Sequence, residues 1–438
     1  MKKPSIFTEL RDFLILWSTQ SLSGLGTAMT SFALTVWVYS EQGTASSVTL
    51  LSVCSVLPSV LFAFLAGAVA DRWDRKRIML LSDTAAAAGT AAILLLYLSG
   101  ALRIWHLYLI NFLLSCMNAF QNPASYVAVS LLVPRRHDTR VSGLQSLSGS
   151  IITILAPALG GLVMGFGGLP AVLAIDLATF AAAFLSLLIF IKIPAGPKKA
   201  GKEEGFLAAC AEGLRYLKEH GALLRIILFF SFINFISKMG GYGMLSPFVL
   251  SRTGGDEAAL GFVQGLTGAG TMLGGALVAV MKPPKRRTAV IFLSCGISFL
   301  LGDIGQSLTG TPPAWAVCGF LSNLPLVFLN ANLTALMRAY VPIEVQGRVF
   351  SARDTLQYTT IPFGLLLGGL LADHVFEPLM AGSSPVQAAL APVFGAGKGA
   401  GLAVMFFLVG VIGALASFLA LCDPSYRTLD GEPGDHQR

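Results

Sequence analysis

The stretch FLILWSTQSLSGLGTAMTSFALTVWVY, from Phe13 to Tyr39, contains no Asp, Glu, Lys or Arg. A helix needs about 20 predominantly apolar residues to cross the hydrocarbon core of a bilayer, so this stretch is long enough to span a membrane. It is too long for the apolar region of a signal peptide and has no clear cleavage site. We therefore expect a membrane-spanning helix here.

The rest of the chain contains many stretches of this kind. Of its 438 residues, 54% are hydrophobic and 12% are charged, whereas a soluble domain carries roughly 25% charged residues. Working outward from Phe13, we predict twelve spans, at residues 13–39, 47–70, 78–99, 104–133, 141–167, 170–191, 223–250, 257–281, 288–308, 314–340, 349–373 and 399–421. Because the bilayer core offers no water to bond the backbone, the predicted fold is an all-α membrane protein with twelve transmembrane helices.

The Lys and Arg residues are distributed unevenly between the two sides that these spans define. Of the 30 Lys and Arg residues, 26 lie in segments on the side of the N-terminus. Arg103, Arg252 and Lys398 lie on the other side, and Lys238 lies within a span. Cytoplasmic loops carry the excess of Lys and Arg. We therefore expect a multi-pass protein of the cell's inner (plasma) membrane with both termini in the cytoplasm, and no nucleic-acid partner, because the basic residues are dispersed over short loops.

The second half of the chain repeats the first at an offset of 208 residues. The matching pairs include Asn122 with Asn330, Pro134 with Pro342, Arg140 with Arg348, and Gly160-Gly161 with Gly368-Gly369. Six helices in each half make this a parallel repeat, as in transporters whose halves rock about a central site. We predict two pseudo-symmetric six-helix halves, residues 1–192 and 223–422, and a cytoplasmic tail at 423–438. Residues 193–222 are expected to form a cytoplasmic linker with an amphipathic helix on the membrane surface, or else a flexible linker.

Polar residues form stripes on the first and fourth spans of each half, at spacings that place them on one helix face. The stripes include Gln20 and Thr27, Asn118 and Asn122, Asn234 and Lys238, and Asn323 and Asn330. A polar face in lipid needs a water-filled cavity or a polar neighbour, so we predict that these residues line a shared substrate cavity. The alternative is that they join neighbouring helices by hydrogen bonds.

Three ionisable residues stand out inside the spans. Lys238 lies near the middle of the seventh, Asp176 about 10 Å inside the sixth, and Asp303 in the outer third of the ninth. Such groups are costly in a membrane and point to function. Lys238 is a candidate to bind an anionic group of a substrate, or to pair with a carboxylate. Asp176 and Asp303 are candidates for proton coupling, the alternative being an ion pair or a carboxylate that reaches interfacial water.

Two motifs are candidates for a conformational switch. The loop after the second span reads Gly67-Ala-Val-Ala-Asp71-Arg72-Trp73-Asp74-Arg75-Lys76-Arg77, where Asp71 among four cations can form a breakable network. Arg348, just before the eleventh span, is a further candidate for the switch. The fifth span carries Pro157, Gly160 and Gly161, and the eleventh carries Gly368 and Gly369. Small residues permit close helix approach, so the alternatives are a topology anchor in the loop and simple packing at the glycines.

These motifs resemble the major facilitator superfamily. Gly67 to Arg77 is similar to the signature of the family between its second and third helices, with Asp74 in place of a second glycine. Ala156-Pro157 with Gly160-Gly161 resembles the helix 5 motif of drug/proton antiporters, with Ala156 in place of the usual glycine.

Three further stretches resemble the branch of macrolide-efflux and enterobactin-exporter proteins. They are Asn122-Pro123-Ala124 running on to Val133-Pro134, Glu212 to Leu217, and Val341-Pro342 running on to Gly347-Arg348-Val349. The likeness extends from Arg11 to Cys422. It implies that the first and fourth helices of each half line a central cavity. It also implies export of small amphipathic molecules, such as antibiotics, by proton antiport.

Other function classes fit the sequence less well. The five histidines are not in metal-ligand spacing and no HExxH or nucleophile-elbow motif occurs, so no enzyme, metal site or cofactor is predicted. A channel would need a selectivity filter. An importer or a lysophospholipid transporter of the same fold stays open, because Lys238 favours anionic or zwitterionic substrates such as siderophores over cationic drugs. We expect a monomer whose partners are the lipid bilayer, a small-molecule substrate and protons.

Overall fold

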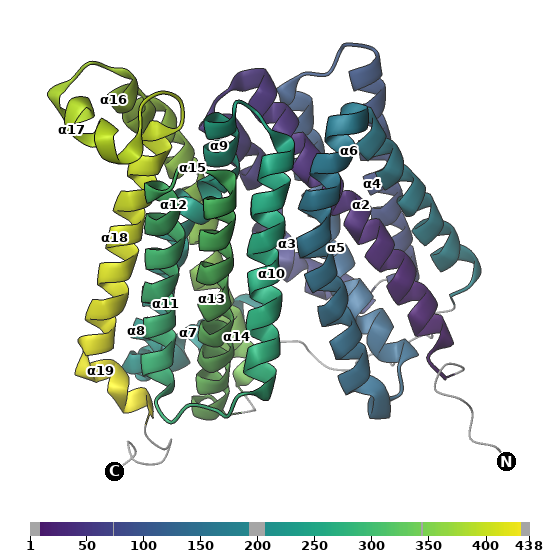
Figure 1. The fold of residues 1–438 in the computed structure, drawn as a ribbon. Helices are drawn as coiled ribbons and strands as arrows, with labels where there is room; N and C mark the ends of the chain where they lie inside the picture. Colours follow the sequence, from purple (N-terminus) through teal and green to yellow (C-terminus); the bar gives the residue numbers. More distant parts are fainter. Residues whose placement is uncertain (1–8, 73, 192–205, 343–344, 431–438) are drawn as a thin grey trace. The chain divides into compact units, whose positions relative to one another are not determined.

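The computed structural model describes residues 9–72, 74–191, 206–342 and 345–430 (Figure 1). Within these ranges all regular secondary structure is helical. Ten helical segments in the described part of the chain are long and apolar enough to cross a membrane. The chain divides into two compact units, one of Met1–Glu41 and Leu51–Gly201, the other of Gln42–Leu50 and Lys202–Arg438.

The N-terminal unit is built from long helices. Their bounds are α2 Arg11–Gln42, α3 Ala45–Arg72, α4 Arg75–Leu98, α5 Ile104–Leu132, the 3₁₀ turn η1 Arg135–His137, and α6 Asp138–Ile189. The first turns of α3, up to Leu50, group with the C-terminal unit. Asp74 precedes α4 and its side chain accepts a hydrogen bond from the Arg77 backbone N–H. The residue that departs from the family signature therefore caps a helix.

Helix α6 bends sharply at Gly168. Its 52 residues would extend about 78 Å as a straight helix, more than twice the thickness of a bilayer core. Gly168 has φ 64° and ψ −171°, a conformation that is open essentially to glycine alone. The two parts of α6 therefore correspond to two predicted spans. Helix α5 is long but is not one of the ten segments counted above, so the number of twelve crossings stays a prediction.

The C-terminal unit contains more, shorter elements because several of its spans are interrupted. They are α7 Phe206–Glu219, α8 Gly221–Met239, α9 Gly241–Thr253, α10 Glu257–Val280, α11 Arg287–Phe299, the π-helical turn η2 Leu300–Ile304, α12 Gly305–Leu308, α13 Pro312–Tyr340, α14 Gln346–Tyr358, α15 Thr360–Leu371, the π-helical turn η3 Ala372–Phe376, α16 Glu377–Ala381, α17 Pro385–Phe394, α18 Ala400–Cys422, α19 Pro424–Arg427 and η4 Thr428–Asp430. Figure 1 shows α16 and α17 at one end of α18 and α19 at the other.

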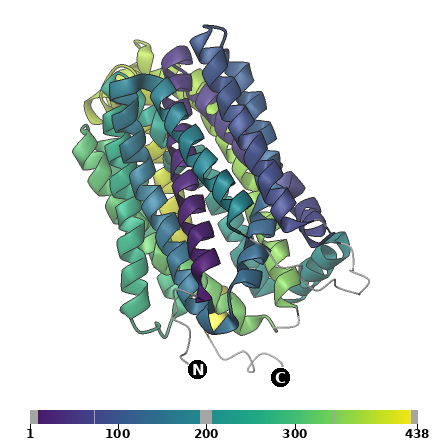
Figure 2. The same cartoon turned by 90° about the vertical axis from the view of Figure 1, so that its right-hand side faces the viewer.

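Close backbone contacts join the helices of each unit. A Cβ atom added at Gly270 of α10 would overlap the backbone of Phe320 in α13. In the N-terminal unit, a Cβ added at Gly160 of α6 would lie 3.0 Å from the Phe32 ring of α2. Figure 2 shows α2, in purple, running beside the teal second part of α6. Small residues at these points therefore set how closely neighbouring helices approach.

Helix α7 forms within the segment that we predicted to be a linker. Gly213 lies directly against the backbone of Arg348 in α14, and Tyr216 Oη donates to the carbonyl of Tyr340 at 3.0 Å. The Arg348 guanidinium forms an ion pair with Glu212. Helix α7 is thus held against the start of α14, and its placement on a membrane surface stays a prediction. Residues 193–205 lie outside the described residues.

Candidate functional site

Asp176 lies at the centre of a cluster of hydroxyl groups in the N-terminal unit. It is 3% exposed. Thr27 and Thr30 of α2 donate to its carboxylate at 3.2 and 2.9 Å, and Thr90 of α4 donates at 3.2 Å. The carboxylate is thus buried and held by three hydroxyl groups, and its role in proton coupling stays a prediction. Thr27, predicted as a cavity residue, is a partner of Asp176.

Asp303 holds the beginning of a helix in the C-terminal unit. The seventh predicted span is broken at Gly240, where α8 ends and α9 begins. The backbone N–H of Gly241 donates to Asp303 Oδ1 at 3.0 Å. On another side, a Cβ added at Gly410 of α18 would lie 2.9 Å from the Asp303 Cβ, so α18 packs closely there. A carboxylate at a helix N-terminus complements the positive end of the helix dipole, so Asp303 stabilises this break.

Lys238 lies in the last turn of α8, just before the same break. Its Nζ is 3.8 Å from the centroid of the Tyr242 ring, a cation–π contact. Among the described residues no carboxylate forms an ion pair with it. The predicted alternative of a carboxylate partner is therefore not seen, and the role of Lys238 in substrate binding stays a prediction.

The predicted cavity asparagines divide into two groups. Asn118 and Asn122 of α5 and Asn330 of α13 are all exposed. Asn323 is partly buried and donates to the carbonyl of Gly319 within its own helix at 3.0 Å. Asn234 of α8 is partly buried. Asn122 and Asn330, the pair related by the internal repeat, are thus both accessible on their units.

Gln20, the first residue of the stripe on α2, has a different partner from Thr27. Gln20 Nε2 donates to Asp83 of α4 at 3.3 Å. Asp83 is 5% exposed and lies five residues inside the predicted span 78–99. Sequence reasoning missed it because a carboxylate about 7.5 Å from a helix end can reach interfacial water. The amide residues Gln20 and Gln121, whose side chains reach α4, were the signal for a buried partner.

Only part of the predicted switch in the loop after the second span can be placed. The surroundings of Gly67 and the side chains of Asp71 and Arg72 lie outside what the structure describes. Lys76 Nζ donates to the carbonyls of Leu188 and Ile191 at 3.0 and 2.7 Å, so it caps the C-terminal end of α6. Arg75 is partly buried and Arg77 is exposed.

The predicted glycine motifs pack within single units. Gly160 lies against α2 as described above, Gly161 is buried, and Pro157 lies inside α6. Gly368 of α15 lies against the backbone of Met239 at the end of α8. Gly369 lies against Ser46 and Thr49 in the first turns of α3, which group with the C-terminal unit. Whether these contacts slide during transport stays a prediction.

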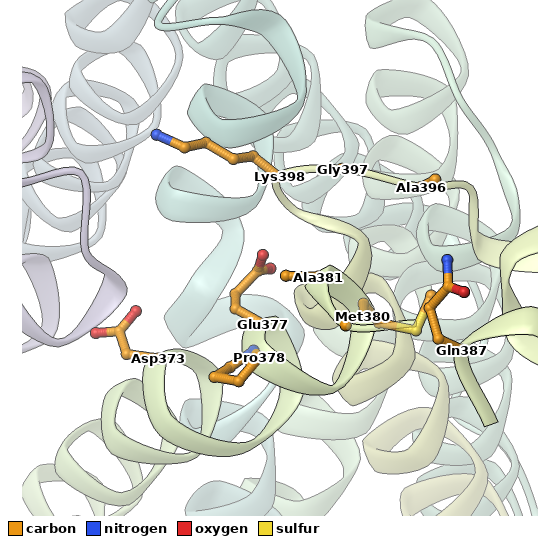
Figure 3. Close-up of a pocket in the computed structure, with 10 residues that line it drawn as sticks. Asp373, Glu377, Pro378, Met380, Ala381, Gln387, Ala396, Gly397 and Lys398 are labelled. Carbon is orange, nitrogen blue, oxygen red and sulfur yellow. The ribbon is translucent and has the colours of Figure 1, made fainter. Parts of the chain in front are cut away.

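A pocket of about 570 Å³ opens at the end of the C-terminal unit where α16 and α17 lie. Figure 3 shows the side chains of Asp373, Glu377 and Lys398 around it. Both carboxylates already cap helices. Glu377 accepts from the backbone N–H groups of Gly399 and Leu402, and Asp373 accepts from those of Ala45 and Ser46. Most of its lining comes from the segment between the predicted spans 349–373 and 399–421, where no site was predicted.

Comparison with known proteins agrees with this architecture. A family model described as the Major Facilitator Superfamily matches residues 16–365. Macrolide efflux protein A of Streptococcus pyogenes is 26% identical over 370 residues, which cover 83% of this chain and 90% of that protein. The multidrug efflux pump Tap of Mycolicibacterium fortuitum is 24% identical over 385 residues, which cover 84% and 90%.

Solved structures show the same fold. The inward-facing, unoccupied structure of a bacterial homologue of the human lysosomal transporter Spinster has a TM-score of 0.70 and 16% identity, covering 98% of this chain and 100% of the other. The nucleoside transporter NupG has a TM-score of 0.68 and 15% identity, covering 93% and 98%. Together with the family match over most of the chain, these comparisons establish that the protein belongs to the Major Facilitator Superfamily and is a multi-pass membrane transporter, not an enzyme.

Proposed function

We propose that this chain is a proton-coupled exporter of small amphipathic molecules that works by alternating access in the cell membrane, with both termini in the cytoplasm. The observation that carries the coupling is the environment of Asp176, a buried carboxylate whose hydrogen-bond donors are three threonine hydroxyls. Asp303, bonded to a backbone N–H at the break between α8 and α9, is the corresponding candidate in the C-terminal unit.

Neutral partners suit a proton carrier better than a permanent ion pair does. A neighbouring Arg or Lys would hold a carboxylate in its charged form. A threonine hydroxyl can donate to a carboxylate and can also accept from a carboxylic acid. The cluster around Asp176 can therefore satisfy both protonation states, which a coupling site must do in each transport cycle.

The direction of transport rests on the relatives, which are named as efflux proteins. The substrate class rests on the polar residues of the spans. Lys238 and the Tyr242 ring offer a cation and an aromatic face at the break after α8, which suits a substrate with an apolar body and an anionic or zwitterionic group. A lysophospholipid has the same chemistry, so a lipid transporter is the second candidate.

A transport assay tests this function. Purified protein is reconstituted in liposomes, and the movement of a macrolide, a cationic dye, a catecholate siderophore and a lysophospholipid is followed under an imposed pH gradient. We expect gradient-dependent movement of one compound class, abolished by a protonophore. Movement that persists without the gradient would contradict proton coupling, and movement of the lysophospholipid alone would favour the second candidate.

We also expect Asn122 and Asn330 to face an aqueous substrate path. Cysteines placed at these positions should react with a membrane-impermeant thiol reagent in intact vesicles, because the reagent needs water to reach them. Leu113→Cys is a matched control on α5, since Leu113 is 52% exposed but apolar and should face lipid. Ala124→Cys, at a fully buried position, controls for unfolding. Equal labelling at Asn122 and Leu113 would argue against an aqueous path.

A further inference from the structure

Asp83 of α4 is a second buried carboxylate in the N-terminal unit that the function proposed above does not use. Gln121 Nε2 of α5 donates to its Oδ1 at 2.5 Å, and Gln20 Nε2 of α2 donates to its Oδ2 at 3.3 Å. Among the described residues no Lys, Arg or His pairs with it. A glutamine amide carries both donors and an acceptor, so after a flip of the amide the same partners can bond a protonated Asp83.

Asp83 and its partner Gln20 lie on the same faces of α4 and α2 as two of the threonines that bond Asp176. On α2, Gln20 bonds Asp83, and Thr27, seven residues later, bonds Asp176. On α4, Asp83 itself is followed seven residues later by Thr90, which also bonds Asp176. Seven residues make about two turns, so Asp83 and the threonines that bond Asp176 of α6 lie along one seam between α2 and α4, at levels about 10 Å apart.

The seam between these two levels carries small or hydroxyl side chains. On α4, Ala86 and Ala87 lie between Asp83 and Thr90 at helical spacing and are partly buried. On α2, Ser23 lies between Gln20 and Thr27 at helical spacing and is 7% exposed. The Ser23 hydroxyl can both donate and accept, so it can relay a proton between the two levels. A chain of hydrogen bonds that joins the two carboxylates can form along this seam through Ser23.

The nearest cation on the same face of α4 is already bonded elsewhere. Lys76, seven residues before Asp83, donates to the carbonyls at the end of α6. An apolar layer separates that level from Asp83 and consists of Leu16, Ile78, Met79, Ala124, Ala128, Leu187 and Ile191.

The helices around Asp83 carry further ionisable groups along their length. On α2, Arg11 and Asp12 precede Gln20 by eight residues or more, and Glu9 before that helix is bonded to Arg136 and His137. The titratable residues of α5 are His106, Tyr108, Cys116 and Tyr126, and α6 carries Asp176 itself after Asp138 and Arg140.

We infer that protons pass between Asp83 and Asp176 along the α2–α4 seam, with Asp83 at the end nearer Lys76. The inference rests on the proton coupling proposed above and assigns its route. A proton that leaves Asp176 breaks one O–H bond, and a proton that reaches Asp83 forms one, with water and Ser23 carrying it between them. Each transfer conserves charge and needs no redox partner.

Infrared difference spectroscopy of the protein in lipid tests the inference without a substrate. Spectra recorded at acidic and neutral pH should contain a carboxylic-acid C=O band that is missing in Asp83→Asn. Thr84→Val, an exposed neighbour on α4, should leave the band unchanged. Gln121→Leu keeps the carboxylate but removes a donor to its charged form. We expect it to move the midpoint of the band to higher pH, which a purely structural role would not do.

A second readout separates failure of the inference from failure of the proposed function. In vesicles loaded with a pH-sensitive dye, we expect Asp83→Asn to lose substrate-dependent proton flux that wild type and Thr84→Val retain. Wild-type flux with an unchanged infrared band in Asp83→Asn would overturn the inference and leave the proton-coupled exporter standing. No gradient-driven movement by folded wild-type protein would overturn both.

Discussion

Asp176→Asn should abolish transport driven by a pH gradient and leave the protein folded. The variant cannot bind and release a proton at this position. Its amide still offers an oxygen to the hydroxyls of Thr27, Thr30 and Thr90, and these hydroxyls can rotate to accept from its N–H groups. In the liposome assay, we expect movement of substrate to fall to the level of vesicles without protein.

Glu41→Gln is the matched control for this experiment. Glu41 is an exposed carboxylate near the end of α2, so the same change of charge there should leave gradient-driven transport intact. Thermal unfolding of both variants in detergent should follow wild type closely. Gradient-driven transport by Asp176→Asn at the wild-type rate would remove Asp176 from the coupling mechanism and leave Asp303 as the candidate.

Gly270→Val should have the largest effect on stability. The Cβ of the new side chain would overlap the backbone of Phe320. A backbone cannot rotate out of the way as a side chain can, so α10 and α13 must move apart along their shared interface. Overpacking of this kind costs about 1–3 kcal/mol. We expect a lower midpoint of thermal unfolding and a less monodisperse elution profile in detergent.

Gly275→Val provides the comparison on the same helix. A Cβ at Gly275 meets no atom within 4 Å. The loss of glycine and the gain of a β-branched residue are then the same in both variants, and only the contact with α13 differs. Equal stability of the two variants would show that α10 and α13 are not packed as closely in the membrane as in the structure.

The two units differ in how they hold the carboxylates inside their spans. In the N-terminal unit, Asp83 and Asp176 bond to side chains of continuous helices. In the C-terminal unit, Asp303 bonds to a backbone N–H that is free because the helix is broken at Gly240. The hydrogen bonds of Asp83 and Asp176 can persist when a proton binds, because their partners can both donate and accept. Protonation of Asp303 weakens the cap of α9. We therefore expect the chain to bend at the break between α8 and α9 when Asp303 binds a proton.

Several features of this protein followed from the sequence because they are properties of single segments. A stretch such as Phe13–Tyr39 is apolar whatever its neighbours are, so the all-α membrane fold could be predicted from hydropathy alone. The family followed from motifs and from the repeat at an offset of 208 residues. Asp176 and Asp303 could be singled out because a charge inside a span is conspicuous.

The partners of these residues depended on the tertiary structure. The sequence predicted that Gln20 and Thr27 share one face of a helix, and the structure shows that this face bonds Asp83 and Asp176. Successive residues of a helix are rotated by about 100°, so a small change in the rotation of α4 would turn Asp83 away from both glutamines. Hydropathy fixes that a helix crosses the membrane but not its rotation about its axis. That rotation is set by contacts such as Gly160 against Phe32, between residues far apart in the chain.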